Sequence, residues 1–148
     1  MKEKPNRPPK IDSKITSVKF TDRAFLNLIS EESGALSSDE AKRAYAGSNA
    51  TTEDWEKAVA AGHIIEIYDG ATMCYPAWQF RPEGGTLSGL TEVLEILKEL
   101  PYFSGVTAAI FMLNLRAYLG GKSPLDVLRH PTQKSLARVI DLAKDELH

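Results

Sequence analysis

Apolar residues recur at helical spacing along most of the chain, and polar stretches separate one apolar run from the next. The first run spans residues 22–30 and places large apolar side chains on one side of a helix. Residues 38–45 and 52–61 predict two further helices, because hydroxyl and acidic residues mark each start and a glycine follows each end. The N-terminal half is therefore expected to begin with short helices.

The pattern changes after these helices. Residues 63–68 and 72–75 are rich in β-branched and aromatic side chains, which favours two strands. Asp69 and Gly70 lie between them and predict a tight hairpin turn, in which both central residues take a positive φ. Pro76 is expected to end the second strand, because proline has no N–H to donate to a sheet.

Helical spacing returns in the C-terminal half. One helix is expected to have Ser88 as its cap and to carry the apolar residues from Leu87 to Leu97. A second helix is expected behind Ser104, with apolar residues at helical spacing as far as Ala117.

Turn signals define the last two helices. Gly120 or Gly121 is expected to end the preceding helix, and Ser123 followed by Pro124 is a cap with proline at the first helical position. The final helix is expected to start near Thr132. Its apolar side would hold Leu136, Ile140, Ala143 and Leu147.

This element order predicts a mainly α fold. Two helices followed by a β-hairpin have the order of a winged helix-turn-helix, in which the second helix enters the DNA major groove. We expect three parts: a flexible basic tail at 1–14, a helix-turn-helix-like module with the β-hairpin at 15–80, and a helical partner-binding module at 81–148.

Composition narrows the classes of function. The 148 residues are 43% hydrophobic, which is enough for a buried core, and a net charge of −2 gives no global attraction to nucleic acid or anionic membranes. The single cysteine, Cys74, and a start without an apolar signal segment favour a cytoplasmic protein. The longest apolar run is too short to span a bilayer, so no membrane partner is expected.

Charge is distributed unevenly along the chain. The tail holds basic residues that can contact DNA or a partner, or that only keep the chain soluble, namely Lys2, Lys4, Arg7, Lys10 and Lys14. Residues 38–70 instead hold seven carboxylates and three basic groups, and the would-be recognition helix opens with Glu53 and Asp54. Because carboxylates repel phosphates, we expect DNA binding by this helix to be weak or absent.

The sequence offers no recognisable catalytic arrangement. The histidines His63, His130 and His148 lie far apart, and none has a second ligand at the spacing of a zinc site. The glycine pairs lack the strand-to-helix context of a nucleotide site. We therefore expect no catalytic residues, no metal and no cofactor, and a protein that acts by binding.

Two segments carry a family resemblance. Residues 75–80 read Tyr-Pro-Ala-Trp-Gln-Phe after the predicted hairpin, and residues 119–129 combine a glycine turn with a proline-led short helix. In this order and at this distance, they resemble the antitoxins of the Xre/MbcA/ParS group over residues 36–148. The resemblance implies a degenerate winged helix-turn-helix followed by a C-terminal helical toxin-binding-like module. It also implies a homodimer and a partner toxin protein encoded nearby.

The same segments have a structural interpretation. The aromatic residues of 75–80 would pack, and Gln79 would satisfy backbone groups where the hairpin meets the helices. The charges of the last two helices could form a solvated face. The resemblance favours the alternative that these charges bind a partner protein. The partner-binding residues would then be Lys122, Arg129, Lys134, Arg138, Asp141, Glu146 and His148.

Two other functions stay open. The chain could be a helix-turn-helix transcription regulator, or an orphan or phage-borne interaction protein that kept the scaffold without a toxin. Promoter binding that a toxin does not change would favour the regulator. The product of the neighbouring gene would separate these functions.

Overall fold

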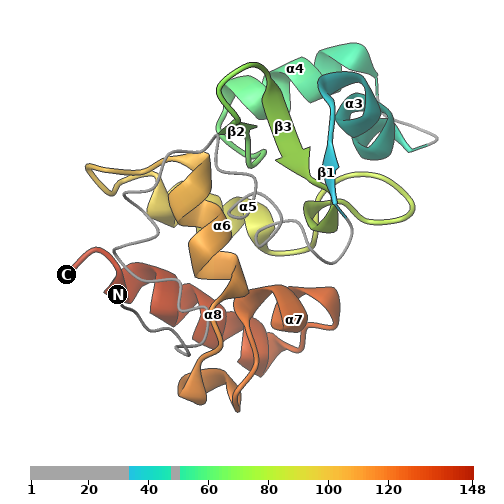
Figure 1. Cartoon of the computed structure of the whole chain (residues 1–148). Coiled ribbons are helices and arrows are strands. Elements are labelled where there is room, and N and C mark those ends of the chain that lie inside the picture. Colours follow the sequence, from blue (N-terminus) through green and yellow to red (C-terminus); the bar gives the residue numbers. More distant parts are fainter. Residues whose placement is uncertain (1–33, 48–50) are drawn as a thin grey trace, which may run out of the picture.

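The computed structural model describes residues 34–47 and 51–148, which form six α-helices and a three-stranded antiparallel sheet (Figure 1). The predicted mainly α class is confirmed at this level. The helix predicted at residues 22–30 and the basic tail at 1–14 lie outside the described residues. In the part of the chain that is described, no helix is both long and apolar enough to cross a bilayer.

The two predicted helices of the N-terminal half are present as α3 (Ser38–Ala46) and α4 (Thr52–Ala60). Each begins with a capping box, in which a hydroxyl and an acidic side chain satisfy each other's backbone N–H groups. Ser37 caps α3 and Thr51 caps α4. The polar starts therefore act as the sequence pattern predicts.

The predicted hairpin is confirmed as β2 (Ile67–Tyr68) and β3 (Met73–Pro76), which pair antiparallel. Its first strand is shorter than predicted, because residues 63–66 are not part of β2. Pro76 is the last residue of β3, as expected. On its other edge β3 pairs with β1 (Ala35–Leu36), so the strand order is β1-β3-β2. Strand β1 was not predicted, because two residues are too few to produce an alternating pattern.

The hairpin turn is longer than predicted. Tyr68 lies opposite Met73, which leaves residues 69–72 as the loop in place of a tight two-residue turn. The Asp69 side chain accepts hydrogen bonds from the backbone N–H groups of Ala71 and Thr72, both at 2.8 Å, and thereby holds this longer loop. Gly70 has a φ of +101°, as its place in the turn predicts.

The helix predicted behind Ser88 begins later, as α5 (Leu90–Leu97), after the short 3-10 helix η1 (Ala77–Gln79). The prediction of Ser88 as its cap is wrong, because Gly89 is the capping residue and takes the left-handed conformation. A Cβ atom at this glycine would lie 2.6 Å from Leu136 Cδ1, so a side chain here would force Leu136 to shift. The left-handed backbone itself favours glycine.

The next helix, α6 (Gly105–Leu113), is capped by Ser104 as predicted but does not reach Ala117. Asn114 takes an extended conformation, and the Arg116 N–H then donates to the Lys122 carbonyl at 2.9 Å. The 3-10 helix η2 (Ala117–Leu119) and its C-cap Gly120 fill the loop between those two residues. The longer helix was therefore a wrong prediction.

The last two helices are α7 (Pro124–Arg129), capped by Ser123 as predicted, and α8 (Gln133–Asp145), which starts next to Thr132 as predicted and is capped by it. The buried side of α8 differs in part from the prediction. Its buried residues are Val139, Leu142 and Ala143, whereas Leu136 and Ile140 are half-buried. Leu147 follows the end of the helix and is exposed, so its assignment to the core is wrong.

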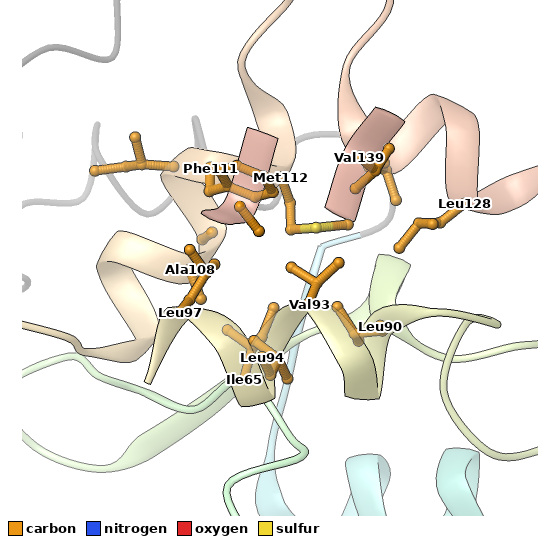
Figure 2. Close-up of a cluster of buried hydrophobic side chains, with 14 of the residues drawn as sticks. Ile65, Leu90, Val93, Leu94, Leu97, Ala108, Phe111, Met112, Leu128 and Val139 are labelled. Carbon is orange, nitrogen blue, oxygen red and sulfur yellow. The ribbon is translucent and has the colours of Figure 1, made fainter. Parts of the chain in front are cut away.

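The buried side chains form two clusters. The larger core joins α5 to α6, α7 and α8, and Figure 2 shows Leu90 and Val93 of α5 facing Met112, Leu128 and Val139 of the other three helices. The smaller core lies under α3, α4 and the sheet and is centred on an aromatic group. In it, Trp55 packs against Tyr45, Tyr75 and Phe80.

Candidate functional site

A groove opens on the surface formed by η2, α7 and α8, with a cavity volume of about 620 Å³. In Figure 1 this is the part of the molecule farthest from α3 and α4. We call it the basic groove. It is lined by Leu119, Lys122, Asp126, Val127, Arg129, His130, Thr132, Lys134, Ser135 and Arg138.

The basic groove brings together four of the seven residues predicted to contact a partner, namely Lys122, Arg129, Lys134 and Arg138. They come from three segments of the chain. Lys122 follows the glycine turn, Arg129 ends α7, and α8 supplies the other two one helical turn apart. Local folding therefore concentrates charges that are spread over the sequence.

The other three predicted residues lie outside the basic groove. Glu146 pairs with Arg116 at 3.1 Å, and the Arg116 guanidinium lies over the Phe111 ring, so this acid ties the end of α8 to the segment after α6. Asp141 accepts a hydrogen bond from the Tyr118 hydroxyl at 3.1 Å. His148 is exposed at the end of the chain.

Arg138 is held in a defined orientation at the wall of the basic groove. Its guanidinium carbon lies 5.0 Å from the centre of the Tyr118 ring, and its Nη1 donates to the Tyr118 carbonyl at 3.2 Å. The hydrogen bond to Asp141 holds the tyrosine from its other end and raises the pKa of Tyr118. The stacked guanidinium loses less freedom on binding than a freely rotating side chain would.

Asp126 is the one carboxylate among the described residues that line the basic groove, and it also caps a helix. Its Oδ2 accepts from the Ser123 N–H at 3.2 Å, while the Ser123 hydroxyl accepts from the Asp126 N–H. The carboxylate keeps its charge in this capping box at the start of α7. Four basic side chains line the groove beside it, so the described lining carries a positive balance.

The start of α4 has the opposite charge. Glu53, Asp54 and Glu56 are all exposed, and Asp54 is engaged with its cap residue Thr51. That hydrogen bond lowers the pKa of Asp54, so the carboxylate is ionised at neutral pH. These charges oppose the approach of DNA phosphates. The candidate DNA contacts in the tail, Lys2 to Lys14, lie outside the described residues.

The described residues also contain no group of three or more metal-ligating side chains. The sequence analysis had missed the apolar lining of the basic groove, Leu119 and Val127, and the role of Tyr118. Because one continuous helix was predicted as far as Ala117, the 3-10 helix η2 that positions these residues was not expected. The exposed tyrosine next to a glycine turn was the signal available in the sequence.

No protein-family model, no curated protein and no solved structure matches this chain. The function has therefore to be inferred from its residues and their geometry.

Proposed function

We propose that this chain is an antitoxin-like protein that binds and neutralises a toxin protein encoded by a neighbouring gene. The observation that carries the proposal is the convergence of Lys122, Arg129, Lys134 and Arg138 on one groove. This groove lies within the segment whose glycine turn and proline-led helix resemble the antitoxins of the Xre/MbcA/ParS group. In the proposal, α5 to α8 are the toxin-binding-like module.

The physical case rests on the kind of side chain at the groove. Arginine is frequent among the residues that dominate binding energy, because its planar guanidinium makes several hydrogen bonds and stacks on aromatic rings. Arg138 already stacks on Tyr118 before any partner arrives. The apolar residues of the lining, Leu119 and Val127, would add apolar burial next to the charged groups, and protein interfaces usually combine the two.

In the proposal, the N-terminal elements do not bind the toxin. Instead, α3, α4 and the β2–β3 hairpin form a degenerate winged helix-turn-helix that retains the scaffold of a DNA reader. The exposed carboxylates of α4 make it a poor ligand for DNA. In the proposal, this module binds the same module of a second copy of the chain and so forms a homodimer.

The test is co-expression of the full chain with the neighbouring gene's product. We expect the product alone to arrest growth, growth to resume when both proteins are present, and the two to co-purify. A neighbouring product that is harmless and does not co-purify would contradict the proposal. In that case, salt-dependent binding to the gene's own promoter would identify a transcription regulator, and its absence an orphan interaction protein.

A further inference from the structure

The basic groove gathers four basic side chains on one surface. Lys134 and Arg138 are one helical turn apart on α8, a spacing at which like charges destabilise a helix. Lys122 and Arg129 face the same cavity from the other two segments, and Asp126 is engaged at the start of α7. An anionic occupant therefore interacts with several positive charges at once.

We infer that the basic groove receives an acidic segment of the partner protein, whose aspartate and glutamate side chains meet these four basic groups. The inference rests on the proposed function, since it names the chemistry of the partner at the same site. The stacking on Tyr118 presents the Arg138 guanidinium in a fixed plane, which suits a carboxylate approaching with two oxygens.

The size and lining of the groove favour a short protein segment over nucleic acid. Its volume of about 620 Å³ is within the range of about 300–1,000 Å³ for sites that hold a compact ligand. It can accept a few side chains, and Leu119 and Val127 offer apolar contact to their carbon atoms.

Charges farther along α8 argue against an extended polyanion. Beyond Arg138 the helix carries Asp141, Lys144 and Asp145, and Glu146 follows its end, so carboxylates outnumber basic groups there. A nucleic acid continuing along α8 would bring its phosphates to these carboxylates, whereas a short acidic segment can end before them. The charge pattern of the helix therefore selects the shorter ligand.

The first experiment compares two charge-reversal variants of the full chain in complex with the neighbouring gene's product. The groove variant combines Lys122→Glu with Lys134→Glu, and both lysines are exposed. The control variant combines Lys57→Glu with Lys144→Glu, which are also exposed and lie outside the groove. Each variant makes the same change in net charge, and circular dichroism verifies that each is folded.

We expect the groove variant to weaken the complex by about tenfold or more and the control to weaken it by less than about threefold. The partner's segment is then identified by replacing Lys134 with a photocrosslinking amino acid, with Lys57 as the control position. A crosslink to a segment rich in aspartate and glutamate supports the inference. A crosslink to a segment without carboxylates or to a second copy of the chain overturns the inference, and so does equal weakening of the complex by both variants. In each of these cases, a stable wild-type complex with the neighbouring gene's product leaves the proposed function intact.

A second measurement tests the groove independently of the neighbouring gene. A fluorescent glutamate-rich peptide and its glutamine counterpart are titrated with the full chain at about 50 mM salt, where charge attraction is weakly screened. We expect the glutamate peptide to bind about tenfold more tightly or better, and the groove variant to lose this preference. Equal binding of both peptides, or a preference that the groove variant retains, overturns the inference.

Discussion

The side-chain amide of Gln79 pairs with both backbone groups of Ile65. Its Oε1 accepts a hydrogen bond from the Ile65 N–H at 2.7 Å, and its Nε2 donates to the Ile65 carbonyl at 3.0 Å. The Nε2 also donates to the Pro76 carbonyl at 3.2 Å. Gln79 is completely buried, so this side chain gives Ile65 the hydrogen bonds that a neighbouring strand would otherwise supply.

Replacing Gln79 by methionine tests this relationship at nearly constant volume. We expect Gln79→Met to lower the free energy of unfolding by about 2 kcal/mol or more, because the N–H and carbonyl of Ile65 lose their partner in a buried place. Urea denaturation gives the value. Gln133→Met, at an exposed position in the first turn of α8, should stay within about 0.5 kcal/mol of the wild type. Equal stability of the two variants would contradict the role of Gln79.

Gly70 tests the hairpin turn. Its φ of +101° lies in a region that a β-branched residue rarely adopts. Gly70→Val should therefore lower the free energy of unfolding by more than about 1 kcal/mol. Ala71→Val places the same side chain at the next exposed position and serves as the control. An unchanged melting temperature of Gly70→Val would rule out this turn.

Gly105 and Gly120 separate steric crowding from backbone strain. A Cβ atom at Gly105 would collide with the Glu66 carbonyl, whereas Gly120, at a φ of +71°, has nothing within 4 Å. We expect Gly105→Ala to cost about 2 kcal/mol because the start of α6 must move away from the backbone before β2. Gly120→Ala should cost about 1 kcal/mol from its left-handed backbone alone. Thermal unfolding of both variants provides the comparison, and a fully stable Gly105→Ala would show that the two segments are not in close contact.

Tyr75 should make stability depend on alkaline pH. Burial, followed by the hydrogen bond to Glu66, raises the pKa of Tyr75 to about 12. An unfolded tyrosine titrates near pH 10, so the folded state favours the neutral phenol. This contribution is complete below about pH 10 and is lost as the pH rises toward about 12.

The measurement is the free energy of unfolding of wild type and Tyr75→Phe between about pH 9 and about pH 12. We expect the wild type to be the more stable at the lower pH and the difference between them to shrink as the pH rises. Tyr102→Phe, at an exposed position, should follow the wild type throughout. A difference that does not change with pH would show that Tyr75 ionises normally.

The carboxylates of α4 predict weak or absent DNA binding by this helix. A gel shift with promoter DNA at physiological salt should show no sequence-specific complex that depends on Glu53 or Asp54. Nanomolar binding whose sequence preference changes in Glu53→Ala or Asp54→Ala would contradict the prediction. Binding that is lost only when residues 1–14 are removed would assign the contact to the tail.

Local signals in the sequence were sufficient to predict most helices of the described region. A hydroxyl residue followed by an acidic, threonine or serine residue three positions later marks the starts of α3, α4, α6, α7 and α8, and each forms a capping box. The prediction failed at Ser88, because α5 begins after Gly89, which caps the helix in a left-handed conformation without a side-chain hydrogen bond. It also failed at β1, whose pairing with β3 is set by tertiary contact.

The candidate site could be predicted only in part for the same reason. The sequence identified Lys122, Arg129, Lys134 and Arg138 as charges near the end of the chain, and local helix geometry relates the last two. The break after α6 decides which of the seven predicted residues share a cavity. Because the chain turns there, Tyr118 lies within hydrogen-bond distance of Asp141, and Arg116 forms an ion pair with Glu146. No periodic pattern in the sequence predicts that break.

The division of the interior into two clusters gives each its own optical probe. The chain has two tryptophans, and Trp55 belongs to the smaller core while Trp78 belongs to the larger. A single phenylalanine substitution at either position leaves one emitter that reports on one cluster only. The fluorescence of Trp55 then reports on the core of α3, α4 and the sheet, and that of Trp78 reports on the core of α5 to α8. A change in one core when a partner binds can therefore be measured separately from the other.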